Sequence, residues 1–213
     1  MIGLPSTTEF NKKIPKQRFY ENLFISPALK RVFVEQIQSI VWANKIAPAT
    51  IAVSAGEKVD EVEVFHITLT SDTLDESALL QMDKQIPYHI LYVLEYDSKY
   101  QLRIGYKESS SGENAFKVNK YYHSRWLDES ELKITIDGYN MDSVYEGFIR
   151  QIGNITAESN KTLDEQIATE EKRAQLEKQI AAMKAKVRKE KQFNRQVELN
   201  KQLKMLIKQL EEL

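Results

Sequence analysis

The chain has 213 residues, with 30 Lys and Arg, 31 Asp and Glu and no Cys, and 42% of its residues are hydrophobic. The absence of Cys excludes a disulfide framework, a Cys-ligated zinc site, an iron–sulfur cluster and a thiol nucleophile. No apolar stretch approaches the roughly 18 residues of a membrane span, and the N-terminal MIGLPSTTEF lacks the features of a secretory signal. We therefore expect a soluble cytoplasmic protein with no membrane partner.

The charge is unevenly distributed along the chain. Residues 1–46 hold seven basic and three acidic residues (net +4), residues 47–156 hold 10 and 18 (net −8), and residues 157–213 hold 13 and 10 (net +3). Together with the hydrophobic pattern, this predicts three parts. They are a basic N-terminal arm over residues 1–25, an α+β domain over 26–155 and a C-terminal coiled coil over 156–213.

The first half of the α+β domain is predicted to begin with a helix. Ser26-Pro27 is a typical helix start, and apolar residues at helical spacing extend the helix to about Asn44. Alternating apolar residues then predict a strand over Val62–Leu69. A short helix over Asp75–Lys84 and an apolar strand over His89–Tyr96 follow.

The second half is predicted to be richer in strands. A turn at residues 97–99 leads to a hairpin strand over Gln101–Tyr106, and further strands are expected over Ala115–Tyr121 and Leu132–Ile136. A helix from about Met141 should stop at Gly153-Asn154. The fold class is therefore α+β, with a mixed or antiparallel sheet and flanking helices.

The last fifty residues contain two apolar repeats typical of coiled coils. The two repeats follow different heptad frames, so a phase slip is expected between about residues 189 and 197. Two helices forming an antiparallel hairpin around residues 191–195 are favoured over one long helix with a stutter. The apolar seams are candidate interfaces for self-association or for a partner: Leu176, Ile180, Met183, Val187, Leu199, Leu203, Leu206 and Leu210.

Few residues match a catalytic pattern. The chain has no Gly-rich phosphate loop, and His66, His89 and His123 lie far apart in the sequence, so we expect no cofactor and no metal. A small metal-dependent nuclease is the enzymatic alternative, because two carboxylates on adjacent strands and a nearby lysine can hold Mg²⁺ and assist an attacking water. Its weak candidates are Glu63, Asp97 and Lys99.

Two basic clusters could contact DNA or RNA. The N-terminal cluster lies beside Phe19 and Tyr20, and the second lies at the expected bend of the coiled coil. The alternative interpretation is that the first clamps the arm onto the domain and the second is a solvated helix face. The candidate residues are Lys12, Lys13, Lys16, Arg18, Lys184, Lys186, Arg188, Lys189, Lys191 and Arg195.

Several segments resemble an uncharacterised bacterial domain family over nearly the whole chain: Leu4-Pro5-Ser6-Thr7, Asn11–Lys16 with Phe19-Tyr20, Ile86–Leu91, Ala115–Val118, Tyr121–His123 and Tyr145–Phe148. This resemblance carries no established activity. It implies partners, because such proteins are typically encoded beside an SNF2-like helicase and an adenine-specific DNA methyltransferase in operons resembling restriction-modification or defence systems.

These observations favour a non-enzymatic accessory or adaptor subunit over an enzyme. Such a subunit would bind the helicase, the methyltransferase or both, and nucleic acid as well. The small nuclease and an independent nucleic-acid-binding protein are the alternatives.

Overall fold

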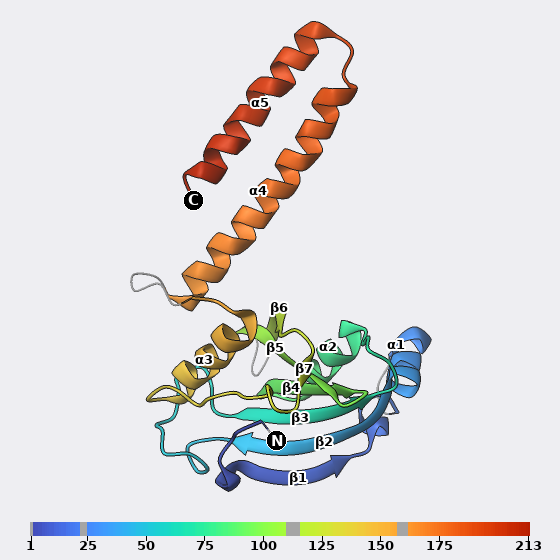
Figure 1. Cartoon of the computed structure of the whole chain (residues 1–213), viewed down its shortest axis with the longest axis vertical. Helices are drawn as coiled ribbons and strands as arrows, with labels where there is room; N and C mark the ends of the chain where they lie inside the picture. Colours follow the sequence, from blue (N-terminus) through green and yellow to red (C-terminus); the bar gives the residue numbers. More distant parts are fainter. Residues whose placement is uncertain (1, 22–24, 110–115, 157–161) are drawn as a thin grey trace. The chain divides into compact units, whose positions relative to one another are not determined.

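The computed structural model describes residues 2–21, 25–109, 116–156 and 162–213 (Figure 1). Seven strands form one sheet in the order β1-β2-β3-β4-β5-β6, with β7 pairing to β5. The strands are β1 (Glu9–Ile14), β2 (Ile37–Ile46), β3 (Val62–Leu69), β4 (His89–Tyr96), β5 (Lys99–Ser109), β6 (Phe116–His123) and β7 (Leu127–Asp128). Only the β3–β4 pair among them is parallel.

Helices cover both faces of this sheet. The helix α2 (Glu76–Gln85) connects the parallel strands, and the Tyr92 hydroxyl of β4 donates to the Leu79 carbonyl of α2 at 3.3 Å. The helix α3 (Met141–Gly153) packs on the opposite face, where the Tyr145 and His89 rings lie 4.3 Å apart. A mixed sheet between helices confirms the predicted α+β fold class.

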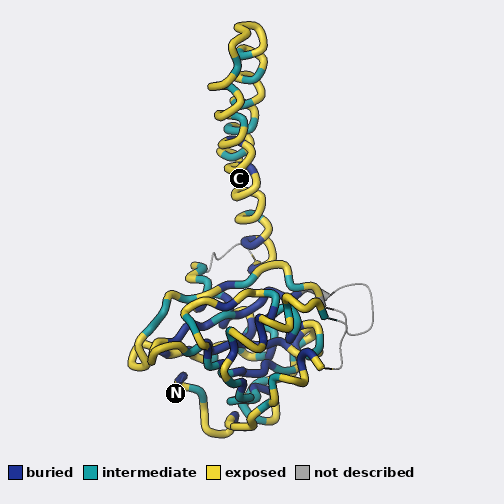
Figure 2. Tube along the Cα trace, turned by 90° about the vertical axis from the view of Figure 1, so that its right-hand side faces the viewer, coloured by how far each residue is buried: buried dark blue, intermediate teal, exposed yellow. Residues whose placement is uncertain are grey.

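Short helical segments complete this part of the chain. They are the 3₁₀ turns η1 (Ser6–Thr8) and η2 (Lys16–Phe19), the helix α1 (Pro27–Arg31) and the π-helical turn η3 (Val32–Gln36). The core on the α2 face joins these turns to the sheet, with Phe33 and Ile37 fully buried beside Leu79. Figure 2 shows the buried residues gathered in the interior of this part.

The helix predicted from Ser26 to Asn44 is wrong beyond Gln36, because residues 37–46 form β2. Ile37 and Ile40 are both fully buried, and their spacing imitates a helical repeat. A bulge between Ile37 and Ser39 inserts one extra residue and turns both isoleucines to the same face of a strand. The β-branched and aromatic residues in this stretch also suit a strand better than a helix.

The strand predicted over residues 132–136 is also wrong. Leu132 and Ile134 alternate inward as a strand would, and both are buried. However, the segment pairs with no strand among the described residues, and the Ile134 amide donates to the Ile2 carbonyl at 3.1 Å. Burial pattern alone does not reveal whether a neighbouring strand is present.

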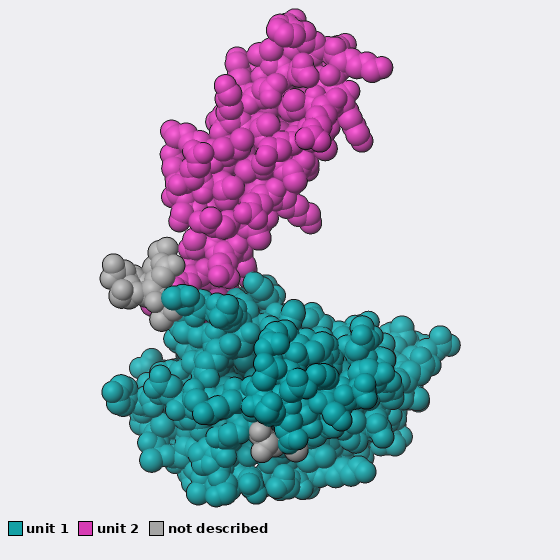
Figure 3. Space-filling view, in the orientation of Figure 1, with its two compact units in different colours: residues 1–156 teal, residues 157–213 magenta. Residues whose placement is uncertain are grey.

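The chain divides into two compact units, residues 1–156 and residues 157–213 (Figure 3). The segment 1–25, expected as an arm, contributes β1 to the sheet of the first unit. The second unit contains α4 (Leu163–Lys189) and α5 (Phe193–Glu211), which form the antiparallel hairpin that the two heptad frames predict. No helix among the described residues is long and apolar enough to cross a membrane.

Candidate nucleic-acid interface

A cavity of about 700 Å³ opens on the sheet face that carries α2, between β1, η2 and the residues that follow α2. Three basic side chains, Lys12, Lys13 and Arg18, contribute to its lining. The remaining lining is mainly aromatic and apolar, and Glu63 supplies its one carboxyl group. These remaining residues are Ile14, Pro15, Phe19, Trp42, Glu63, Phe65, Gln85, Ile86 and Tyr88. We call this cavity the basic–aromatic pocket.

Sheet pairing brings these residues together from distant parts of the sequence. Lys12 of β1 is the register partner of Trp42 in β2, and Trp42 is the partner of Phe65 in β3. Partners in adjacent strands project on the same side of a sheet. One row of side chains across three strands therefore supplies a cation and two aromatic rings.

Neighbouring groups hold the Trp42 ring in place. Its indole Nε1 donates to the Asn44 carbonyl at 3.0 Å. The centroid of its ring lies 4.1 Å from that of Phe10 and 6.3 Å from that of Phe65. The pocket wall is thus a pre-formed aromatic surface.

Glu63 is the unusual residue of the pocket. This residue is 1% exposed, and neither of its carboxyl oxygens has a hydrogen-bond partner among the residues that the structure describes. Burial, together with the nearby carboxyl of Glu61, raises the pKa of Glu63 to about 8, and Lys45 opposes the shift. Lys45 lies at 2.5 Å from Glu61 Oε2, so its ammonium is paired with the other carboxylate.

The N-terminal basic residues do not all have the same role. Lys12, Lys13 and Arg18 are exposed and line the pocket, and none of them makes an ion pair within the described residues. Lys16 instead donates from Nζ to the carbonyls of Val34 and Ile37, at 3.1 and 2.6 Å. A cation at these carbonyls stabilises the end of the helical turn η3.

The nuclease candidates do not come together. Glu63 pairs with Ile90 near the start of β4, whereas Asp97 lies in the turn beyond its end. Ile90 and Asp97 are seven residues apart along the chain, which corresponds to roughly 23 Å at the usual rise per residue of a β-strand. Lys99 Nζ lies 2.5 Å from Asp128 Oδ1. No group of three or more His, Cys, Asp or Glu among the described residues is placed to hold a metal ion.

The second basic cluster surrounds the turn between α4 and α5. Lys184, Lys186, Arg188 and Lys189 lie in the last turns of α4, Lys191 lies between the helices and Arg195 lies in the first turn of α5. All six are exposed, and Arg195 Nε lies 4.0 Å from Glu190 Oε2. Basic residues at a helix C-terminus also stabilise the helix itself.

The apolar seam of the hairpin is only partly covered. Leu176 and Ile180 of α4 are buried, and Met183 and Val187 are half-buried. Leu199, Leu203, Leu206 and Leu210 are half-buried as well, and no residue of α5, which is described throughout, is buried. A groove of about 450 Å³ lies between the two helices beside Met183, Met205 and Leu206.

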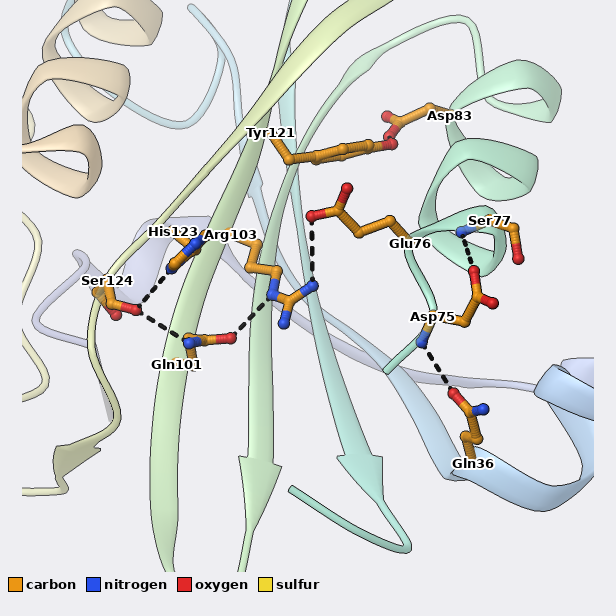
Figure 4. Close-up of polar contacts among 10 residues, drawn as sticks. All are labelled: Gln36, Asp75, Glu76, Ser77, Asp83, Gln101, Arg103, Tyr121, His123 and Ser124. Carbon is orange, nitrogen blue, oxygen red and sulfur yellow. Dashed lines mark hydrogen bonds and ion pairs between the residues drawn. The ribbon is translucent and has the colours of Figure 1, made fainter. Parts of the chain in front are cut away.

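A separate polar cluster joins α2 to β5 and β6 (Figure 4). Arg103 Nε donates to Gln101 Oε1 at 2.8 Å, and its Nη1 lies 3.7 Å from Glu76 Oε1. Gln101 Nε2 donates to the Ser124 carbonyl at 3.0 Å, and His123 Nδ1 lies 3.2 Å from the same oxygen. The groups satisfy one another, which is typical of a structural network.

A buried ion pair lies at the α2 end of this cluster. Asp83 Oδ1 and Lys107 Nζ are 2.8 Å apart, with both side chains almost completely buried. The Tyr121 hydroxyl donates to Asp83, and Lys107 also donates to the Tyr88 carbonyl at 2.5 Å. Burial lowers the pKa of Lys107, and the charge of Asp83 opposes this shift. The ion pair therefore attaches α2 to β5 of the sheet.

The sequence identifies the pocket's basic residues as candidates for nucleic-acid binding and Glu63 as a candidate for a nuclease site, so it does not predict that they share a pocket. Trp42, Phe65 and Tyr88 are not predicted as site residues. The apolar spacing predicts a helix through Trp42, and no binding motif includes the other two residues. The alternation that predicts β3 puts Glu63 on the Phe65 side, so a charged residue on that apolar face is a signal visible in the sequence.

A mixed sheet carrying a basic–aromatic pocket, followed by a helical hairpin, defines a two-unit α+β protein. The chain belongs to the family described as Domain of unknown function (DUF4391), whose model matches residues 2–210. No curated protein and no solved structure matches the chain.

Proposed function

We propose that the protein is a non-enzymatic adaptor subunit, which binds nucleic acid through the first unit and a protein partner through the hairpin. The observation that supports nucleic-acid binding best is the convergence of Lys12, Lys13 and Arg18 on one aromatic pocket. Basic side chains attract phosphates, and aromatic rings stack on unpaired bases. An adaptor is favoured over a nuclease because Glu63 and Asp97 lie at opposite ends of their strands.

The partner of the hairpin is proposed to be a protein. Its apolar groove is lined by Met183, Met205 and Leu206 and bordered by amide side chains. A partly exposed leucine seam on two helices suits an amphipathic helical segment of another chain. The family resemblance makes the SNF2-like helicase or the adenine-specific DNA methyltransferase of the same operon the specific candidate, in a restriction-modification or defence assembly.

Salt dependence tests the nucleic-acid part of this proposal. The affinity of the full chain for fluorescent single-stranded oligonucleotides should fall steeply with salt concentration, because binding releases counterions from phosphates. Lys12→Gln/Lys13→Gln should lower the slope of log affinity against log salt by about 1.4, since each lost phosphate contact on a single strand removes about 0.7. Fluorescence anisotropy measures both quantities.

The matched control is Lys117→Gln/Lys120→Gln, which removes the same charge from exposed positions on β6, at the other edge of the sheet. This variant should retain the wild-type slope. Equal slopes for the two double variants would reject the pocket as the site of phosphate contact, and undetectable binding by the wild-type chain would reject nucleic-acid binding.

A further inference from the structure

The basic–aromatic pocket is the size of a small-molecule site. Its volume of about 700 Å³ lies within the usual range of roughly 300–1,000 Å³ for ligand pockets. Such a cavity can enclose the base and sugar of one nucleotide. Its exposed cations and its buried carboxyl group are chemically different regions, so the pocket suits a ligand with an anionic part and a neutral polar part.

Glu63 indicates where the neutral polar part would bind. A buried polar group without a hydrogen-bond partner is costly, and native proteins rarely retain one without a reason. Glu63 lines the pocket and is 1% exposed, and within the described part of the chain neither of its oxygens has a hydrogen-bond partner. A ligand in the pocket can supply the missing hydrogen bonds.

The aromatic residues fit a flat ring between the cations and this carboxyl group. Tyr88 is the most exposed large aromatic residue of the lining, at 36%, and Trp42 and Phe65 form the wall behind it. Stacking on such rings tolerates any base, because every base has a π face. Lys45 Nζ lies over the Tyr88 ring, 5.9 Å from its centroid. This cation–π contact holds one face of the ring in place.

We propose that the pocket binds one nucleotide with an unpaired base, which stacks on Tyr88 and Trp42 and hydrogen-bonds with Glu63, while its phosphate contacts Lys12, Lys13 and Arg18. The proposal rests on the nucleic-acid function proposed above and names the ligand unit of that same site. The nucleotide belongs to a single strand or is free, and the experiment separates these two sources.

The protonation state of Glu63 gives this site a characteristic pH dependence. Burial raises the pKa of Glu63 to about 8, so at pH 7 the carboxyl group is mainly protonated and offers one donor and one acceptor. The Watson–Crick edge of every unpaired base presents a donor beside an acceptor. Above the pKa the group only accepts and also repels the phosphate, so binding weakens as the pH rises.

Lysine and arginine side chains ordinarily stay charged between pH 7 and 9, and carboxylates ordinarily stay ionised there. The charged and titratable groups around Glu63 are Glu61 on β3, Lys45 on β2, Lys12 and Lys13 on β1, Arg18 on η2 and Tyr88 before β4.

The test measures the affinity of the full chain for fluorescent oligo-dA and oligo-rA, with adenosine monophosphate as competitor. The wild-type affinity should fall about tenfold between pH 7 and pH 9, as a group with a pKa near 8 loses its proton. Glu63→Gln keeps a donor and an acceptor at every pH, so it should bind at pH 7 and lose the pH dependence. Circular dichroism checks that each variant is folded.

The aromatic part is tested by Tyr88→Ala, which should lower the affinity about tenfold, within the range measured for stacking on one base. Its control is Tyr139→Ala, at a residue that is 95% exposed and outside the pocket, and this variant should bind like the wild type. Competition by adenosine monophosphate at concentrations similar to those of the oligonucleotide assigns the site to free nucleotides, and much weaker competition assigns it to a strand.

Two results would overturn the inference. Oligonucleotide binding that survives Tyr88→Ala and shows the same pH dependence with Glu63→Gln leaves nucleic-acid binding in place but removes the nucleotide from this pocket. Absence of binding to both oligonucleotides and to adenosine monophosphate removes the nucleic-acid function as well.

Discussion

At the scale of single residues, Glu63 stands apart because its environment conflicts with its charge. It occupies a position on the apolar α2 face of β3, beside Phe65, and Lys45 is paired with Glu61 instead. Proteins usually place such a group where a ligand or a proton compensates for its burial. The shifted pKa of Glu63 therefore has consequences for stability as well as for binding.

We predict that stability falls as the pH rises from about 5 to about 8. The folded-state pKa of about 8 is above the ordinary value for Glu, so the folded chain holds a proton that the unfolded chain releases in this window. The contribution is complete below the unfolded pKa and is lost as the pH rises through the folded pKa, at up to about 1.4 kcal/mol per pH unit. Glu63→Gln should flatten the dependence in urea titrations, and an unchanged slope would contradict the shift.

At the scale of elements, α2 organises the face that carries the pocket. It begins at Asp75, whose carboxylate accepts from the Ser77 amide at 2.9 Å and whose own amide donates to Gln36 Oε1 at 2.8 Å (Figure 4). It is then held over the sheet by the Asp83–Lys107 pair. The residues after α2 continue into the pocket wall, so the attachment of this helix positions Ile86 and Tyr88.

We predict that Lys107→Met destabilises the fold by about 3–5 kcal/mol, because it leaves the carboxylate of Asp83 buried without an opposite charge. Asp83→Asn/Lys107→Met should recover part of this loss, since the double variant buries no charge and keeps an acceptor for Tyr121. Chemical denaturation of the two variants and the wild type gives the comparison. A double variant less stable than Lys107→Met would show that the pair is not the main contribution.

At the scale of the whole molecule, the two units differ in how they are stabilised. The first buries a core on both faces of its sheet, whereas α5 in the second unit buries no residue. A hairpin with an exposed seam gains most from a partner that covers its apolar groove. This difference fits an adaptor with one ligand-binding unit and one protein-binding unit.

We predict that Met205→Glu weakens capture of the proposed partner, an SNF2-like helicase or an adenine-specific DNA methyltransferase, with at least a tenfold loss of affinity in co-purification and titration. Met205 lines the groove and is 66% exposed, so a charge there opposes burial by a partner without removing a buried contact. The adjacent Lys204→Gln, outside the groove, changes the charge equally and should have no effect. Equal losses, or no capture of either neighbour, would count against this interface, and concentration-dependent mass in light scattering would assign the groove to a second copy.

The sequence by itself determined the elements whose signals are local. Correct predictions of a strand, two helices and the hairpin came from the alternation in Val62–Leu69, the apolar residues of Asp75–Lys84, the stop at Gly153-Asn154 and the shift of heptad frame. These signals depend on nearest neighbours along the chain, which sequence spacing records.

Only the tertiary structure decided which distant residues share a surface. The bulge in β2 made Ile37 and Ile40 resemble a helix, and the missing partner of residues 132–136 left a strand-like pattern without a strand. The pairing of β1, β2 and β3 joined Lys12, Trp42 and Phe65 in one pocket with Glu63, and the pairing of β3 with β4 separated Glu63 from Asp97. Strand order and register depend on contacts between remote segments, and no local pattern specifies them.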